Sequence, residues 1–164
     1  MAPFGTRRAG PSCVKENPIV KNYSYKVRVR LVRERAGAFG PAMNCAGDIA
    51  AAFGPELTAL DREHFMCLHL DAKNRLISRE TVSIGHLTAA LVHPREVFKA
   101  AILANAASIA LIHGHPSGDP EPSREDVEIT RRLVKAGELL GIPVLDHVVV
   151  ATRGHVSLAE RGLS

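Results

Sequence analysis

The chain of 164 residues has no tryptophan, only 4% aromatic residues and only three cysteines. The cysteines are odd in number, widely spaced and form no C-x-x-C pair, which argues against a disulfide network and a cysteine zinc cluster. No apolar run approaches the roughly 18–20 residues that span a bilayer, and the N-terminus lacks the apolar segment of a secretory signal. We therefore expect a cytoplasmic protein with no membrane contact.

The net charge of +4 is unevenly distributed along the chain. Residues 1–35 hold nine Lys/Arg and two Glu, a charge of +7, whereas the remainder holds twelve Lys/Arg and fifteen Asp/Glu, a charge of −3. A basic segment can bind nucleic acid, but such segments are more often solvated tails, and the chain has few aromatic residues for base stacking. The sequence predicts at most a weak nucleic-acid contact through residues 1–35.

Composition and periodicity divide the chain into three segments. We expect a loose basic arm at residues 1–25, a strand and short helices packed on the core at 26–60, and the core itself at 61–164. The expected strands are 26–34, 64–70, 75–83, 108–113, 142–151 and 155–158, and the expected helices are 46–53, 56–61, 94–105 and 123–140. The pattern indicates a single α/β or α+β domain, with a mixed β-sheet packed between helices.

The segment HGHPSGDPEPSRED, from His113 to Asp126, carries the most specific chemistry. Alternate side chains of an extended chain point to the same face, so His113 and His115 can aim both imidazoles at one point. The Pro/Gly-rich turn that follows can bring the Asp126 carboxylate there too. Two imidazoles and one carboxylate, with a fourth position left for water, are typical of a catalytic zinc site. The sequence therefore predicts one Zn²⁺ ion and a hydrolase.

Each half of this segment also has an ordinary structural interpretation. Ser123 would be the N-cap of a helix and Asp126 would follow three residues later, as in a capping box. A lone His-x-His pair is a weak signal, because histidines are common on surfaces and in satisfied cores. The two interpretations are compatible, since a capped helix start would hold Asp126 in place beside the histidines.

The pattern H-x-H-P, six residues, S-x-x-D resembles the JAMM (MPN-plus) zinc metallopeptidase motif. The flanking sequences LDREHFMCLHLDAKNRLISRETVSIG and LGIPVLDHVVV are similar to the bacterial RadC-like JAB domain, over residues 60–162. The resemblance implies a single JAB/MPN-like domain with cytidine-deaminase-like layering. Longer members carry an N-terminal helix-hairpin-helix DNA-binding module, and because we find no such pair here, we expect a short form.

The resemblance also implies a role for each matching residue. The zinc ligands would be His113, His115 and Asp126, and Ser123 would steady the oxyanion or the metal-bound water. The general base of the family would be Glu80, in the segment RETVSIG, which could take a proton from water and pass it to the leaving amine. Without the resemblance, Glu80 would be interpreted as a solvent-facing strand residue.

Several nearby residues fit the pattern less directly. The family often has Asn at the position of Gly114, and Gly there could loosen the loop or leave a hydrogen bond around the ligands unmade. Asp146 and His147 resemble a DH pair of the family; His147 could support the site, but we interpret the two as a buried, hydrogen-bonded polar pair. The remaining histidines are interpreted as structural: His64, His69, His86, His93 and His155.

Three functions follow from these features. The first is a zinc-dependent metallopeptidase or isopeptidase that acts on a peptide or protein substrate. The second is a DNA-associated repair or recombination accessory protein that binds through the basic N-terminal segment. The third is a JAB interaction module without catalysis. Because the ligand set is complete, the first is our leading hypothesis, while the substrate and the oligomeric state stay open.

Overall fold

The computed structural model describes residues 40–85 and 92–164. The basic segment at residues 1–35 and the strand expected at 26–34 therefore lie outside the described residues. Three helices and five strands follow one another in the order α1 (Ala46–Thr58), β1 (His64–Leu70), β2 (Leu76–Ile84), α2 (Pro94–Leu103), β3 (Ser108–Gly114), α3 (Arg124–Leu140), β4 (Val144–Ala151) and β5 (Gly154–Ser157).

The strands form one mixed sheet with the order β2-β1-β3-β4-β5. β1 pairs antiparallel with both β2 and β3, and β4 pairs antiparallel with β5. β3 and β4 are parallel, so the chain must cross over between them, and α3 is that crossover. The expected mixed sheet is confirmed, and β3 is its central strand.

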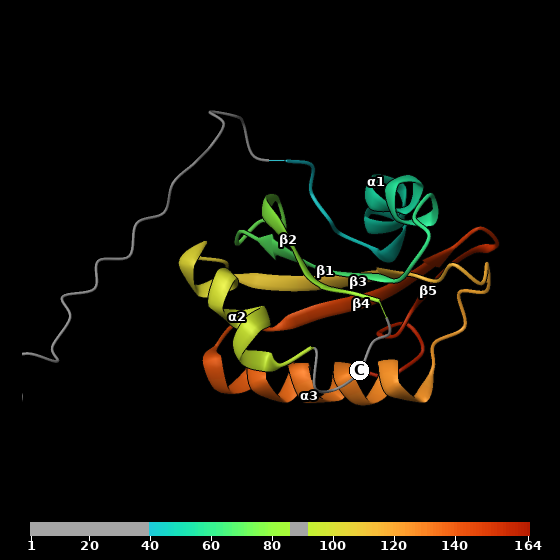
Figure 1. Cartoon of the computed structure of the whole chain (residues 1–164). Helices are drawn as coiled ribbons and strands as arrows, with labels where there is room; N and C mark the ends of the chain where they lie inside the picture. Colours follow the sequence, from blue (N-terminus) through green and yellow to red (C-terminus); the bar gives the residue numbers. More distant parts are fainter. Residues whose placement is uncertain (1–39, 86–91) are drawn as a thin grey trace, which may run out of the picture. The chain divides into compact units, whose positions relative to one another are not determined.

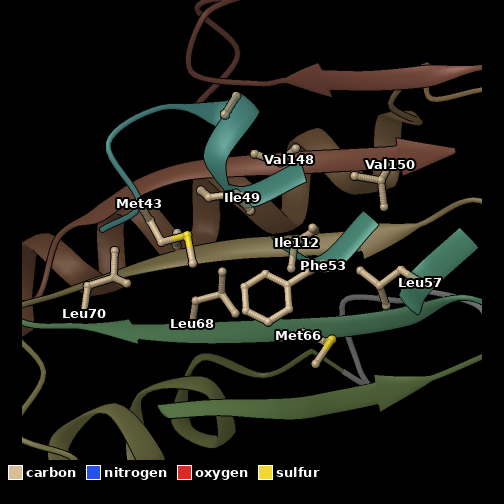
Figure 2. Packing of buried hydrophobic residues seen from close by; sticks show 12 residues of the cluster. Met43, Ile49, Phe53, Leu57, Met66, Leu68, Leu70, Ile112, Val148 and Val150 are labelled. Atoms are coloured by element: carbon tan, nitrogen blue, oxygen red, sulfur yellow. The ribbon is translucent and has the colours of Figure 1, made fainter. Parts of the chain in front are cut away.

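Helices cover both faces of the sheet (Figure 1). On one face, Ile49, Phe53 and Leu57 of α1 pack against β1, β3 and β4, as Figure 2 shows. On the other face, α2 and α3 contribute Phe98, Ile129 and other residues to a second buried cluster. Because both faces are covered, every residue of β3 is buried. The predicted single α+β domain, with its sheet between helices, is confirmed.

Most element boundaries agree with the sequence expectation within one or two residues. The division of the first helical region at residues 46–53 and 56–61 is wrong, because α1 continues to Thr58 and contains Pro55. The spacing of Ile49, Phe53 and Leu57 explains the difference. These residues lie four apart on one face and are all buried, so packing on the sheet outweighs the hydrogen bond that proline cannot make.

The structure also bears on the expected absences. Cys45 and Cys67 are both free thiols, the first exposed and the second buried. Burial raises the pKa of Cys67, and the nearby Glu80 charge raises it further, which makes this thiol unreactive. Within residues 40–85 and 92–164, no helix combines the length and apolar character needed to cross a membrane.

Candidate metal centre

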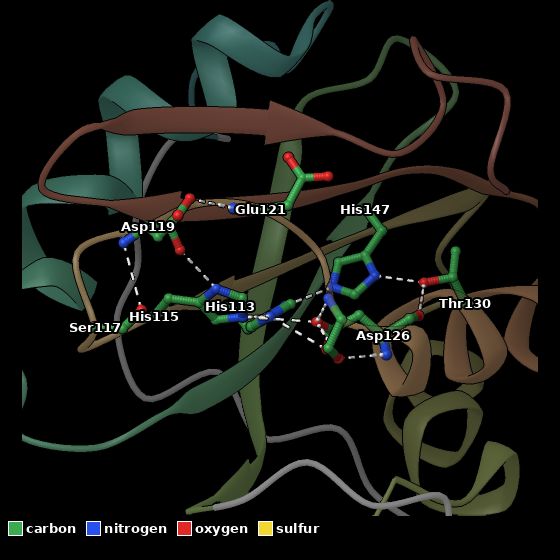
Figure 3. A network of polar contacts seen from close by, with 9 residues as sticks. His113, His115, Ser117, Asp119, Glu121, Asp126, Thr130 and His147 are labelled. Carbon is green, nitrogen blue, oxygen red and sulfur yellow. Dashed lines mark hydrogen bonds and ion pairs between the residues drawn. The ribbon is translucent and has the colours of Figure 1, made fainter.

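Three of the predicted site residues meet at the carboxyl end of the central strand (Figure 3). His113 is the penultimate residue of β3, His115 follows the strand, and Asp126 lies in the first turn of α3. The side chains of His113 and Asp126 are 0% and 2% exposed, whereas that of His115 is 13% exposed. The cluster is therefore buried on the side of the sheet and reaches solvent beside His115.

The donor atoms of this cluster have the separations of a tetrahedral metal site. The two Nε2 atoms of His113 and His115 lie 2.9 Å apart, and the Asp126 oxygens lie 3.3 Å from His113 and 3.6 Å from His115. Ligand atoms about 2.0–2.1 Å from a tetrahedral zinc ion are separated by roughly 3.3 Å. The three residues thus fit one zinc ion.

The hydrogen bond on the far side of a histidine ring determines whether the nitrogen that faces the cluster can bind a metal ion. His115 Nδ1 lies 2.8 Å from the Asp119 carbonyl oxygen, which can only accept, so Nδ1 carries the proton. In a neutral ring, Nε2 then has a free lone pair. His113 Nε2 faces it across 2.9 Å, so a cation between the two rings could bind both nitrogens.

The Asp126 carboxylate is held by the start of α3. Its Oδ2 accepts hydrogen bonds from the Ser123 backbone N–H and hydroxyl, each at 2.7 Å, while Ser123 Oγ accepts from the Asp126 backbone N–H at 3.1 Å. Burial alone would raise the pKa of Asp126, but the imidazoles of His113 and His115 together with Ser123 lower it. The capping-box interpretation is confirmed, and the carboxylate is kept ionised for a cation.

The loop after β3 is fastened to the β4–β5 hairpin. The His115 N–H donates to the Val150 carbonyl at 2.9 Å, and the Arg153 N–H donates to the Gly118 carbonyl at 3.3 Å. Gly114 also has a packing reason, because a Cβ there would lie 3.1 Å from both Cβ and the carbonyl oxygen of Leu57. A larger residue at this position would push against the end of α1.

The structure does not place Glu80 in contact with the three ligands. Glu80 pairs with Cys67 on β1 and shares the sheet face of His113, but its charged neighbours are Lys99 and Glu96 of α2. Its Oε2 is buried without a hydrogen-bond partner among the described residues, and burial raises its pKa. The role of Glu80 as general base stays a prediction.

A second carboxylate, which the sequence analysis missed, acts electrostatically on the cluster. The nearby Asp126 carboxylate is the main cause of the raised pKa of His115, because it favours the protonated ring, and the negative charge of Glu63 adds to it. Glu63 directly precedes β1, and Phe65 of that strand pairs with His113. Because β1 and β3 are antiparallel, continuing this register by two residues would bring Glu63 opposite His115. The β1–β3 register is the signal that would have identified Glu63.

Comparison with known proteins agrees with this geometry. The family described as the RadC-like JAB domain matches residues 43–163. The chain belongs to the RadC-like JAB domain family. Two UPF0758 proteins are similar to this JAB domain, one from Desulforamulus reducens (50% identity over 121 residues) and one from Caldanaerobacter subterraneus subsp. tengcongensis (55% over 115 residues). The alignments cover 74% and 70% of this chain, and 53% and 49% of the relatives. The chain thus spans about half the length of the relatives it matches.

The DH pair of this RadC-like JAB domain is not paired through its side chains. Asp146 accepts from the Ser157 hydroxyl, the Ala159 N–H and the backbone N–H of His147. The His147 ring points the other way, since alternate strand residues face opposite sides of the sheet, and its Nε2 lies 2.8 Å from His113 Nδ1. Burial lowers the pKa of His147, so this ring is neutral. The interpretation as hydrogen-bonded polar residues is confirmed, although the His147 ring contacts His113 and not the Asp146 side chain.

Proposed function

We propose that this chain is a zinc-dependent hydrolase of peptide or isopeptide bonds. The observation that carries the proposal is the convergence of His113 Nε2, His115 Nε2 and one Asp126 oxygen within 4.8 Å of one another. A zinc ion held there would supply Lewis-acid polarisation of a carbonyl group and would make a coordinated water more acidic. Three protein ligands leave room for one further ligand, as in catalytic rather than structural zinc sites.

The chain's own residues would orient and protect this chemistry. Burial of His113 and Asp126 excludes water from the inner side of the cluster, so a substrate must approach from the side of His115. The Ser123 hydroxyl already donates to Asp126 at 2.7 Å and would hold the carboxylate in place. Its predicted contact with an oxyanion would require that hydroxyl to change partner as the substrate binds.

Proton transfer needs a carboxylate within reach of the water and the leaving amine. Glu80 is the residue implied by the sequence motif, and burial raises its pKa towards the range of a useful base. The negative charge of Glu63 acts on His115, which supports Glu63 as a second candidate for this role. We propose Glu63 as the proton carrier and keep Glu80 as the alternative.

The first test is the zinc content of the purified protein. We expect about one zinc per chain in the parent, and none in a His113→Ala/His115→Ala double variant that remains folded by circular dichroism. A parent that takes up no zinc even after reconstitution would reject the hydrolase and would leave the JAB interaction module as the better description.

The second test separates the two carboxylates by activity on a library of peptide and isopeptide substrates. Glu63→Gln should retain zinc but lower kcat by at least about 100-fold, the usual scale of a lost general base. Glu80→Gln should stay within a few-fold of the parent, and the exposed Glu138→Gln serves as a matched control. The reverse pattern would restore Glu80 as the base, and full activity in both variants would reject this mechanism.

The charge of +7 on residues 1–35 supports a second candidate, an accessory protein that binds nucleic acid. Binding dominated by phosphate contacts should weaken steeply as salt is raised. We expect duplex DNA to bind weakly, and binding to disappear when residues 1–35 are removed. Tight binding that survives both changes would contradict an electrostatic contact through this segment.

A further inference from the structure

Three hydrogen bonds behind the metal centre form a relay from His113, through His147 and Thr130, to the backbone of Asp126. His113 Nδ1 lies 2.8 Å from His147 Nε2, His147 Nδ1 lies 2.5 Å from Thr130 Oγ1, and that hydroxyl lies 2.6 Å from the Asp126 carbonyl oxygen. The relay thus begins at the ring of one candidate ligand, His113, and ends at the backbone of another, Asp126. Figure 3 shows this route through the rings.

The donor and acceptor of each hydrogen bond in this relay follow from its last acceptor, the Asp126 carbonyl oxygen. A carbonyl oxygen can only accept, so the Thr130 hydroxyl donates its single proton to Asp126. The Thr130 oxygen must then accept from His147 Nδ1–H. A neutral His147 therefore presents an unprotonated Nε2, which accepts from His113 Nδ1–H. His113 is left with its proton on Nδ1 and a lone pair on Nε2, the atom that faces His115 and Asp126.

The opposite direction fails at both ends. If Thr130 donated to His147, its oxygen and the Asp126 carbonyl oxygen would lie 2.6 Å apart with no proton between them. The relay would then put a proton on His113 Nε2, and that nitrogen could bind no cation. Only the first direction places a proton in each of these three contacts and leaves His113 Nε2 free for a metal ion.

Burial keeps bulk water away from the three side chains of this relay. His113, His147 and Thr130 are all 0% exposed, so bulk water cannot replace either partner. Phe65 covers both rings, stacked at 6.1 Å between centroids on His113 and edge-on at 5.3 Å to His147. Asp126 and Thr130 are one turn apart on α3, so the same helix turn carries a ligand and sets the protonation of another.

From this arrangement we propose that Thr130 and His147 are positioning residues that hold His113 as the Nδ1–H tautomer, with Nε2 free for the metal. A ligating histidine commonly donates its other N–H to a carboxylate or a backbone carbonyl. Here a neutral histidine and a hydroxyl take that place, which adds no second negative charge to the buried centre. This inference rests on the proposed zinc hydrolase for its purpose, but its first readout does not require zinc.

That readout is the tautomer of His113 in the metal-free protein, measured by heteronuclear NMR of the histidine side chains at a pH above their titration range. We expect His113 and His147 both to carry the proton on Nδ1. A proton on Nε2 of His113 in the parent protein would overturn the inference, whether or not the protein binds zinc. The expected tautomers in a protein that binds no zinc would support the relay and reject only the proposed function.

The second readout is zinc affinity in variants of the hydroxyl. Thr130→Val keeps the shape of the side chain but removes the hydroxyl that donates to the Asp126 carbonyl and accepts from His147. We therefore expect a mixture of His113 tautomers, and zinc affinity weakened about 10- to 100-fold. Thr130→Ser restores the hydroxyl and should return the parent tautomer and an affinity within a few-fold of the parent.

The matched control is Thr58→Val. The Thr58 hydroxyl donates to the Gly54 carbonyl at 2.8 Å, the same contact on α1, but within the described residues it makes no hydrogen bond to a histidine. This variant should leave both the tautomer and the zinc affinity unchanged. Parent-like tautomers and affinity in Thr130→Val would overturn the inference, as would equal weakening in Thr130→Val and Thr130→Ser.

Discussion

Single hydrogen bonds decide what the metal centre can bind. His115 donates to the Asp119 carbonyl and His113 to His147, so both rings turn an unprotonated Nε2 towards the Asp126 carboxylate. The carboxylate is in turn held by Ser123. Each ligand is therefore oriented by a bond on its far side, which is the feature that separates a built site from a chance cluster.

Ser123 should affect stability and metal binding together. Ser123→Ala removes the hydroxyl that caps α3 and that donates to Asp126 Oδ2. We expect the free energy of unfolding of the metal-free protein to fall by about 1 kcal/mol, and zinc affinity to fall roughly 10-fold. Urea denaturation and chelator competition measure the two effects. Ser117→Ala, in the exposed loop after His115, should change neither; a Ser123 variant that behaves like it would contradict the double role.

His69 should make the metal-free protein sensitive to mild acid. It is 2% exposed, its Nδ1 contacts Ser78 Oγ at 2.8 Å, and its Nε2 has no partner among the described residues. Burial lowers its pKa from 6.5 to about 4. Between these values the unfolded chain binds more protons, so stability is complete above pH 6.5 and falls as the pH drops towards 4.

The test compares the parent with His69→Gln, which can keep the contact with Ser78 but does not titrate. Between neutral pH and about pH 5, the parent should lose roughly 2 kcal/mol more free energy of unfolding than the variant. Urea denaturation at several pH values, with a chelator present, measures the difference. Equal losses in the two proteins would show that His69 is not held neutral by burial.

Short-range and long-range features differ in how far the sequence could predict them. The motif from His113 to Asp126 is contiguous, so its ligands could be found without knowing the fold. The proposed roles of Glu63 and His147 depend on pairing between strands far apart in the chain: Phe65 with His113, and His147 with Leu111. No local pattern contains that register, so the sequence points to Glu80 alone as a base and does not reveal the contact between His147 and His113.

At the scale of helices and strands, glycine marks where elements approach closely. In α3, a Cβ on Gly137 would lie 2.5 Å from the Ile142 carbonyl oxygen and 3.2 Å from Phe98 of α2. In α1, the exposed Gly47 would meet only the Cys45 sulfur, at 3.6 Å. The same substitution should therefore have opposite effects in the two helices.

Gly47→Ala should raise the free energy of unfolding by up to about 1 kcal/mol, because alanine favours the helix and constrains the unfolded chain. Gly137→Ala gains the same propensity but forces backbone atoms apart, so we expect a net loss of about 1–3 kcal/mol. Urea denaturation of both variants gives the sign. Stabilisation by Gly137→Ala would show that α3 and the turn before β4 can separate at little cost.

The arrangement of elements was easier to predict than the length of one of them. Alternating strands and the β3–α3–β4 order already indicate a sheet with a crossover helix, and the hairpin at residues 71–74 fixes β1 beside β2. The helix α1 was divided because Gly54-Pro55 is a local stop signal. Burial of Phe53 and Leu57 on either side of that signal depends on the sheet beneath, which only the assembled fold provides.

For the molecule as a whole, the two buried clusters lie on opposite faces of one sheet, and only one face carries the metal centre. The α1 cluster contains no candidate ligand, whereas β3, the loop directly after it and α3 supply all three. If zinc binds only the folded protein, a free zinc concentration about 100 times the dissociation constant would add roughly 2.7 kcal/mol to the free energy of unfolding. This added stability slows hydrogen exchange only at amides whose exchange requires the ligands to separate.

Amide hydrogen exchange measured with and without zinc would therefore distinguish the two faces of the sheet. Amides of β3 and of the first turns of α3 should exchange up to about 100-fold more slowly with zinc, because both elements must stay in place for the ion to remain bound. Amides of α1 that exchange by local opening should not change. The His113→Ala/His115→Ala variant should show no zinc effect at any amide. Equal protection of α1 and α3 would mean that both faces open together, and the sheet would then couple the metal centre to the helix on its far side.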